Sequence, residues 1–408
     1  MAYCEKWGSN FKYVGGMEIK KEYKMTDVGV IPEDWEVKSI GEIAKTTSGG
    51  TPSREDDSLY IGKNRWFTTS ELNDGYIYDS IEHISDEAIK ITTARIVPAN
   101  SILMAMYGAT IGKLAIITKE SSTNQACCAI MVNSDIVMKY VFYNLLFLRQ
   151  NIIELGVGAG QPNISQSIVR SIHISIPSKK EQQAIADALT KVDNLIMSLS
   201  KVIEKKKLIK KGTMQKLLSG EMRLDGFEGE WIKIKLGDIS SIKTGSRNVE
   251  EHSANGKYPF FVRSKEVMKI NTFSYDEEAI LVPGEGGIGE IFHYVNGKFD
   301  VHQRVYKISD FNDKVNALFI YWYMIIFFGE YAKENTVKAT VDSLRLPTFT
   351  DFICCLPPTK AEQTAIADIL TTMDNEIEAL EKERDKYKCI KQGMMQQLLT
   401  GKIRLICQ

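Results

Sequence analysis

The chain has 408 residues and a formal net charge of −1 at pH 7, a length that fits two or three globular domains. Its 44% hydrophobic and 25% charged residues are typical of a soluble globular protein, and its apolar runs are far shorter than a membrane-spanning helix requires. The near-zero charge argues against nucleic-acid binding through overall positive charge, although a local basic patch could still bind.

The seven cysteines and five histidines predict neither a disulfide framework nor a metal site. No two cysteines have the C-x-x-C spacing, and the histidines are scattered along the chain. Residues 1–16 lack the apolar core of a signal peptide. We therefore expect reduced thiols, no bound metal and a cytoplasmic location.

Two segments are predicted to form similar globular domains, residues 29–176 after an extension of residues 1–28, and residues 223–356. Both have short alternating apolar runs broken by Gly, Pro, Asn and Ser. This pattern is typical of mostly β or α+β domains. The expected fold class is α+β.

Residues 177–222, between these domains, predict a long helix. The helix is expected to begin after Pro177, where Ser178 can cap it, and to end at Gly220. Its apolar residues alternate three and four positions apart, which is typical of a coiled-coil seam. The seam residues are Ile185, Ala188, Val192, Leu195, Leu199 and Val202. The lysines at 205–207, 210 and 211 are expected to form a solvated flank of the coiled coil.

The helical segment recurs at residues 357–408, with Glu362 aligned to Glu181 at a constant offset of 181 residues. The second copy keeps the seam residues Ile366, Met373, Leu380 and Tyr387 but has Glu376 and Glu383 where the first copy has Leu195 and Val202. Duplication of a lobe followed by a helix predicts a pseudo-two-fold molecule. The two helices are expected to pack antiparallel and to separate two lobes.

The globular domains are related more loosely than the helices. Matching residues lie 177 to 196 positions apart, because the loops between them differ in length. The matched pairs are Trp35 with Trp231, Gly41 with Gly237, Gly49 with Gly245, Ser70 with Ser264, Gly112 with Gly289 and Gln125 with Gln303. We expect one fold used twice with different loops.

No motif in the chain predicts catalysis. Gly284, Gly286 and Gly289 satisfy G-x-G-x-x-G, but a strand-like run follows them where the motif requires a helix, and Glu285 would repel phosphate. The chain also lacks an amino-methyltransferase motif, paired carboxylates and a Ser/His/Asp set. It is therefore expected to have neither an active site nor a cofactor of its own.

Two different lobes on one spacer suit a long, repeating ligand. DNA is the natural candidate, because half-sites on one face of the duplex recur about every 34–36 Å. Loops in both lobes carry residues that can bind phosphates and base edges. In the first lobe the candidates are Ser48, Gly50, Thr51, Arg54, Lys63, Arg65, Thr68, Thr69, Tyr107, Thr110, Gln161 and Asn163. In the second they are Lys243, Thr244, Arg247, Asn248, Arg263, Ser264, Lys265, His302, Gln303 and Arg304. Any one of these could instead be an ordinary polar loop residue.

The chain resembles the specificity subunits of type I restriction–modification systems over nearly its whole length. The resemblance rests on the repeated E-Q-x-A-I-A-D-x-L-T helix, its M-Q-x-L-L-[ST]-G ending, the opening V-G-V-I-P-E-D-W-E-V, and the segments WFTTSEL and GATIGK. It implies two target-recognition domains that each recognise one half of a bipartite, asymmetric DNA site. Paired helices, with Ile185, Val192, Leu199, Ile366, Met373 and Leu380 on their seam, would set the gap.

The resemblance also implies partners. Two methyltransferase subunits would dock on the chain and methylate adenine with S-adenosylmethionine, and restriction subunits would use ATP and Mg²⁺. Residues 1–24, which precede the usual lobe opening, depart from the pattern and are either an arm near the C-terminus or disordered.

Two other hypotheses remain open: a coiled-coil adaptor with two protein-binding lobes, and a methyltransferase or nuclease that acts alone. The DNA sequence and the gap length do not follow from the sequence, since base recognition depends on loop conformation and DNA shape.

Overall fold

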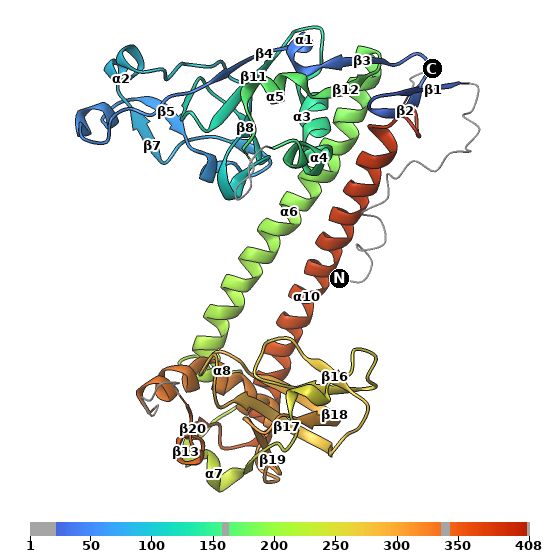
Figure 1. Cartoon of the computed structure of the whole chain (residues 1–408). Helices are drawn as coiled ribbons and strands as arrows, with labels where there is room; N and C mark the ends of the chain where they lie inside the picture. Colours follow the sequence, from blue (N-terminus) through green and yellow to red (C-terminus); the bar gives the residue numbers. More distant parts are fainter. Residues whose placement is uncertain (1–21, 157–162, 336–342, 406–408) are drawn as a thin grey trace. The chain divides into compact units, whose positions relative to one another are not determined.

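The computed structural model describes residues 22–156, 163–335 and 343–405 and divides into two compact units (Figure 1). Unit 1 comprises residues 1–198 and 383–408, and unit 2 comprises residues 199–382. Each unit contains one globular lobe and segments of two long helices, α6 (Lys179–Leu218) and α10 (Lys360–Leu398). The boundary between units therefore falls inside both helices.

Unit 1 is built on a mixed five-stranded sheet, whose order is β4-β11-β8-β9-β6. These strands are β4 (Ala44–Ser48), β6 (Tyr76–Ile77), β8 (Ile102–Ala105), β9 (Leu114–Ile117) and β11 (Cys127–Val132). A three-stranded sheet consists of β10 (Ser122–Thr123), β5 (Asn64–Phe67) and β7 (Glu82–Ile84). Two antiparallel pairs complete the unit. The first is β1 (Tyr23–Thr26) with β2 (Gly29–Pro32), and the second is β3 (Glu36–Ser39) with β12 (His173–Ile176).

Short helices connect and cover these strands. They are α1 (Ile40–Ile43), η1 (Asp57–Tyr60), η2 (Thr69–Glu71), α2 (Asp86–Ile91), η3 (Gly108–Thr110), α3 (Met138–Phe147), α4 (Arg149–Glu154) and α5 (Gln166–Ser171). The main core of unit 1 joins Trp35 and Tyr140 to Ile185 and Leu189 of α6 and to Leu398 of α10, all buried. The start of one long helix and the end of the other are thus part of the lobe's core.

Unit 2 repeats this plan with one continuous six-stranded sheet, whose order is β14-β19-β17-β18-β15-β16. Its strands are β14 (Ser241–Thr244), β15 (Tyr258–Phe261), β16 (Met268–Ile270), β17 (Tyr275–Pro283), β18 (His293–Val301) and β19 (Val305–Ser309), with a separate pair of β13 (Ile232–Lys235) and β20 (Ile353–Leu356). Its helices are α7 (Leu236–Ile239), η4 (Val249–Glu251), α8 (Ala317–Glu334) and α9 (Leu346–Thr350). The core packs Phe319 and Phe328 against Leu217 of α6 and Ile366 of α10. The expected α+β class is confirmed for both lobes.

The ends of the long helices lie where local sequence predicts them. Ser178 Oγ accepts the backbone N–H of Glu181, and Thr359 Oγ1 accepts that of Glu362, each at 3.3 Å. After the helices, Gly220 and Gly401 have φ values of +75° and +68°, a left-handed conformation that favours glycine.

The predicted seam of the first helix is wrong in one of its two rows. Leu195 and Val202 are 38% and 41% exposed, whereas the neighbouring row buries Leu189 and Ile203. The two rows could not be distinguished by spacing alone, because both rows consist of apolar residues. The other row agrees better, since Ile185 and Ile366 are buried and Val192, Leu199, Met373 and Leu380 are partly buried. Glu376 and Glu383 align with the exposed row, so they do not disturb the seam.

Reciprocal ion pairs join the two helices within each unit. In unit 2, Lys210 pairs with Asp374, and in unit 1 the equivalent residues Lys391 and Asp193 pair with Nζ–Oδ1 at 2.6 Å. Lys206 and Lys207 also reach α10, through Glu376 at 2.7 Å and Glu381 at 2.6 Å. Residues that lie later in one helix contact residues earlier in the other, so the pairing is antiparallel in both units. The expected solvated flank is confirmed for Lys205, Lys207 and Lys211, which are exposed, whereas Lys206 and Lys210 are partly buried where they contact α10.

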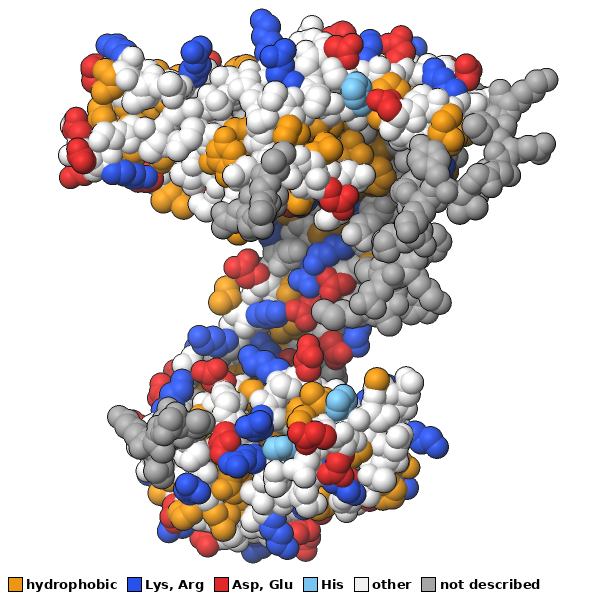
Figure 2. Space-filling view, in the orientation of Figure 1, with side chains coloured by type: hydrophobic (Ala, Val, Ile, Leu, Met, Phe, Trp, Pro, Cys, Tyr) orange, Lys and Arg blue, Asp and Glu red, His pale blue; other side chains and the backbone are white. Residues whose placement is uncertain are grey.

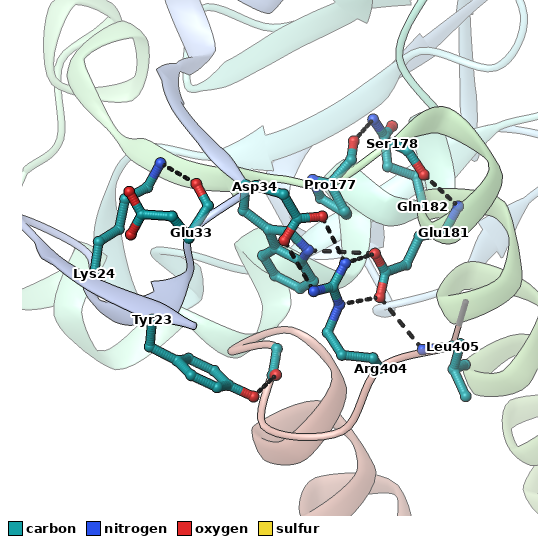
Figure 3. A network of polar contacts seen from close by, with 12 residues as sticks. Tyr23, Lys24, Glu33, Asp34, Pro177, Ser178, Glu181, Gln182, Arg404 and Leu405 are labelled. Atoms are coloured by element: carbon teal, nitrogen blue, oxygen red, sulfur yellow. Dashed lines mark hydrogen bonds and ion pairs between the residues drawn. The ribbon is translucent and has the colours of Figure 1, made fainter. Parts of the chain in front are cut away.

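A second reciprocal contact ties each helix end to the start of the other helix. In unit 1, Arg404 Nε and Nη2 donate to the buried Glu181 carboxylate at 2.8 and 2.9 Å, and its two Nη atoms donate to Asp34 (Figure 3). Trp35 Nε1 donates to the same Glu181 at 3.3 Å. In unit 2, Arg223 makes the equivalent fork to the fully buried Glu362 at 2.6 and 2.8 Å. The carboxylates would be costly to bury without these guanidinium groups.

The N-terminal hairpin of unit 1 packs against the same helix end. Tyr23 Oη donates to the carbonyl of Gly401 at 3.1 Å, and a Cβ added at Gly401 would lie 2.4 Å from Pro32 Cδ. The described part of the predicted extension, from residue 22 onward, is therefore an ordered hairpin beside the C-terminal end of α10. Most of the extension, residues 1–21, lies outside the described residues.

Replacing Arg404 by Met should destabilise unit 1, because it leaves the Glu181 carboxylate buried without its counter-charge, a cost of about 3 kcal/mol. Arg223→Met is the matched change in unit 2. Hydrogen-exchange mass spectrometry under native conditions measures both units in one sample. We expect each variant to lose amide protection mainly in its own unit. Equal losses in both units for either variant would contradict this assignment.

Candidate nucleic-acid interface

Backbone hydrogen bonds bring the predicted loops of the first lobe together. Gly50 donates to Thr123 at 2.9 Å, and Asn124 donates to Phe67 at 3.0 Å. The loop after β8 joins them, since Met106 donates to Ala126 at 2.8 Å and accepts from Ile164 at 2.9 Å. Backbone hydrogen bonds thus hold together loops that lie more than 100 residues apart in the sequence.

The second lobe repeats this network. His302 donates to Phe261 at 3.0 Å and Gly284 donates to Arg304 at 2.9 Å, while Leu344 donates to Gly284 at 2.8 Å. These bonds match those of Asn124, Met106 and Ile164 in the first lobe. Both lobes therefore support their loops on the same backbone framework.

One glycine in each lobe is required by this framework. A Cβ at Gly49 would lie 1.8 Å from the carbonyl oxygen of Thr123, and one at Gly245 would lie 2.1 Å from that of Val301. Neither neighbour can move away without breaking a strand, because both atoms belong to the backbone. The close approach sets the first polar loop of each lobe against the strand beside it.

All three predicted cationic side chains of the first lobe pair with carboxylates of the same lobe. Arg54 forks onto Glu82 at 2.6 and 2.8 Å and stacks on the Tyr60 ring with its Cζ 4.1 Å from the centroid. Arg65 pairs with Asp79 at 2.9 Å and Lys63 with Asp86 at 3.4 Å. The fork and the stacking make Arg54 a structural residue of this loop.

The remaining candidates of the first lobe are polar and uncharged. Thr51 bonds to Gln125, and Thr68 bonds to Glu71 as the cap of η2. Tyr107 is 40% exposed. Ser48, Thr69 and Thr110 are partly exposed, Gly50 is buried, and Asn163 is exposed. Gln161 lies outside the described residues.

In the second lobe, two candidates serve the interior more than the surface. Arg247 donates to the fully buried Asp300 at 3.0 Å and to Glu251 at 3.0 Å. His302 is 6% exposed, and its burial lowers its pKa, as do the positive charges of Arg263 and Arg304. It is therefore neutral at pH 7, and its Nδ1 accepts the backbone N–H of Arg304 at 3.1 Å. A buried imidazole does not fit the predicted contact with DNA.

The other candidates of the second lobe face solvent. Gln303 Nε2 donates to Asn248 Oδ1 at 2.7 Å. Lys243, Thr244 and Lys265 are exposed, and Ser264 is partly exposed with its Oγ bonded to the Glu266 carbonyl.

Arg263 and Arg304 share one acidic partner, which sequence reasoning considered only as a residue that repels phosphate. Glu285 accepts from Nη1 of Arg263 at 3.4 Å and from Nη1 of Arg304. It comes from the glycine-containing loop after β17. Its role could be predicted only by knowing that residues 263, 285 and 304 meet.

The described residues of the two lobes give no indication of a metal site or of a reactive thiol at Cys128. They contain no group of three or more His, Cys, Asp or Glu side chains that could hold a metal ion. Burial raises the pKa of the Cys128 thiol to about 12, so this cysteine remains protonated at neutral pH. Across the same residues, no helix combines the length and apolarity that a membrane crossing demands.

Basic and acidic side chains lie interspersed on each lobe on the face shown in Figure 2. This mixture agrees with the formal charge of −1 and with the carboxylate partners of the arginines. The surface suits polar recognition with little overall electrostatic attraction.

Residues 32–210 and 228–386 match the family described as type I restriction modification DNA specificity domain. The chain belongs to this family. It is 27% identical to the type I restriction enzyme MjaVIII specificity subunit of Methanocaldococcus jannaschii, over 97% of this chain and 96% of that protein. It is also 31% identical to the MjaIX specificity subunit of the same organism, over 61% of each chain.

A solved structure supports the fold. The S subunit of a type I restriction–modification system from M. genitalium matches with a TM-score of 0.66 at 19% identity, over 92% of this chain and 98% of that chain. The chain is thus a DNA specificity subunit, a non-catalytic component whose system carries catalysis on other subunits.

Gly49→Ala should disrupt the first lobe's loop framework, with a loss of about 3 kcal/mol in the stability of unit 1 from overpacking against backbone. Gly393→Ala, in the α10 segment of the same unit, is the control, because a Cβ there meets nothing within 4 Å. It should stabilise the helix by about 0.5–1 kcal/mol. Urea unfolding followed by hydrogen exchange in unit 1 measures both. Similar stabilities for the two variants would refute the close-approach argument.

Proposed function

We propose that each unit recognises one half of a bipartite, asymmetric DNA site. The observation that carries this proposal is the repeated backbone framework with different side chains on it. Hydrogen bonds at Asn124, Met106 and Ile164 recur at His302, Gly284 and Leu344, while the loops they support differ in charge. A shared framework gives both lobes one way of approaching DNA, and different side chains give each lobe its own sequence.

The long helices set the gap between the half-sites in this proposal. Both α6 and α10 continue through the boundary between the units, at residues 198–199 and 382–383. Reciprocal pairs, Lys210 with Asp374 and Lys391 with Asp193, hold them antiparallel in each unit. Paired helices resist bending better than a single strand of chain would, which suits a spacer.

The partners follow from the family and the repeat. Specificity subunits assemble with the other subunits of their systems and bind DNA. We further propose two methyltransferase subunits, one for each copy of the helix repeat, which use S-adenosylmethionine to methylate adenine in each half-site. Restriction subunits would supply ATP- and Mg²⁺-dependent steps in the cytoplasm. This chain would bind no cofactor itself.

Exchanging the first lobe for that of another specificity subunit should change one half of the recognised sequence only. The complex of this chain with its methyltransferase is expressed in a host that lacks other adenine methylation, and N6-methyladenine is mapped across the genome. We expect a bipartite motif from the original chain and a motif with one new half from the exchanged chain. Methylation without any sequence motif would favour an adaptor that contributes no specificity.

Inserting four helical residues after Leu199 and four after Leu380 should lengthen the gap and leave both half-sites unchanged. One turn adds about 6 Å along a helix, which corresponds to roughly two base pairs at 3.4 Å each. The same methylation map measures the gap. A change in the bases recognised, at constant gap, would rule out the spacer role.

A further inference from the structure

Three charged side chains meet on the surface of the second lobe. Glu285 accepts from Arg263 on one side at 3.4 Å and from Arg304 on the other. The side chains of Arg263 and Arg304 are 49% and 55% exposed, while that of Glu285 is 19% exposed. The carboxylate therefore lies between two guanidinium groups that extend farther into solvent. We call these residues the Arg–Glu–Arg cluster.

Hydrogen bonds hold the backbone under Glu285 and Arg304. Glu285 follows Gly284, whose backbone bonds to Arg304 at 2.9 Å and to Leu344 at 2.8 Å, and it forms an isolated bridge with Ser343. The backbone N–H of Arg304 donates to Nδ1 of the neutral His302 at 3.1 Å. Such support places the side chains in advance, which lowers the entropy cost of binding.

The first lobe has different chemistry at the equivalent positions. The shared hydrogen bonds align Met106 with Gly284, Ala126 with Arg304 and Phe67 with Phe261. The counterparts of Arg263, Glu285 and Arg304 are then Thr69, Tyr107 and Ala126. The same three places thus carry two cations and an anion in one lobe, and a hydroxyl, a phenol and a methyl group in the other.

The cluster has the donors and acceptors of a G·C reader. Arginine donates a pair of hydrogen bonds to O6 and N7 of guanine, and a carboxylate accepts from N4 of cytosine. A guanidinium has five N–H donors and a carboxylate about four acceptor sites. In the described contacts Glu285 engages one Nη of each arginine, so donors and acceptors remain for a base pair.

Other arginines of the candidate interface lack this availability. Arg54 has both Nη atoms on Glu82 and stacks on Tyr60. Arg247 divides its donors between the buried Asp300 and Glu251, and its side chain is 30% exposed. These two residues hold their loops, whereas Arg263 and Arg304 extend from theirs.

We propose that Arg263, Glu285 and Arg304 determine the specificity of the second lobe by binding the major-groove edge of a G·C base pair. Arg304 donates to guanine, Glu285 accepts from the cytosine amino group, and Arg263 positions Glu285. Thr69, Tyr107 and Ala126 occupy the corresponding places for the other half-site. This assignment rests on the proposed function, that each lobe recognises one half of the DNA site.

The cluster also explains how a wrong sequence is rejected. The Glu285 carboxylate repels phosphate oxygens and the guanine O6 and N7 acceptors, so it penalises any pose that does not present a donor. Specific interfaces discriminate between partners through unpaired charges against the wrong partner as well as through contacts with the right one. Specificity at this position therefore comes from repulsion as well as attraction.

The test uses the complete complex with its methyltransferase and the genomic map of N6-methyladenine. Arg304→Lys keeps the positive charge but cannot donate in a fork. We expect one guanine position in one half-site to become degenerate, with at least about tenfold lower discrimination, and the other half-site to stay unchanged. Glu285→Gln should shift the preference at that base pair toward adenine, since glutamine pairs with adenine N6 and N7.

Controls separate this assignment from the general function. Lys265→Ala, an exposed neighbour on the same loop, should lower methylation of all sites without changing either half of the motif. Thermal unfolding of each variant shows whether it is folded, and Arg304→Lys retains the charge opposite Glu285. If the original chain gives a bipartite motif and both cluster variants keep every base of it, the cluster assignment is overturned while the proposed function stands. If the original chain gives no motif, the proposed function itself fails.

Discussion

The arginine that follows each long helix and the glutamate that begins the other helix form the contact on which the rest of each unit depends. Arg404 binds Glu181, and Arg223 binds Glu362. Both carboxylates are buried, so each lobe is complete only when the end of one long helix reaches the start of the other. The contact requires the two helical segments to keep the same number of residues, because one inserted residue in a helix would turn the arginine by about 100°. The constant offset of the repeat agrees with this requirement.

The two lobes tolerate different loops because their hydrogen-bond frameworks are backbone to backbone. Asn124 and His302 donate their amides to equivalent phenylalanine carbonyls, whatever their side chains are. Within the described residues, this framework demands glycine at positions such as 49 and 245, where backbone atoms approach too closely for a Cβ. Side chains above the framework are therefore free to change with the DNA sequence, and the two lobes have diverged there.

Local features of the sequence predicted the helix ends and the class of fold, because caps, glycine stops and alternating strands are determined by near neighbours. The seam was predicted only in part, since Leu195 and Leu189 are equally apolar and tertiary packing decided which row was buried. The equivalence of the two lobes followed from matching their sequences, whereas the contacts between the loops did not. Whether each arginine is paired with a carboxylate could not be predicted, because the partner lies far along the chain, 28 residues away for Arg54 and 53 for Arg247. Glu285 illustrates the limit: its charge counted against a phosphate site, and only the fold shows that it lies between two arginines.

Charge compensation within the lobes gives a physical reason for the near-neutral chain. An arginine that already contacts a carboxylate gains less from a phosphate than a solvated one does, so non-specific attraction to DNA is weak. A base pair that offers both acceptors and a donor can satisfy arginine and glutamate together without separating them. In the proposed assignment, the Arg–Glu–Arg cluster therefore contributes more to discrimination between sequences than to general affinity for DNA.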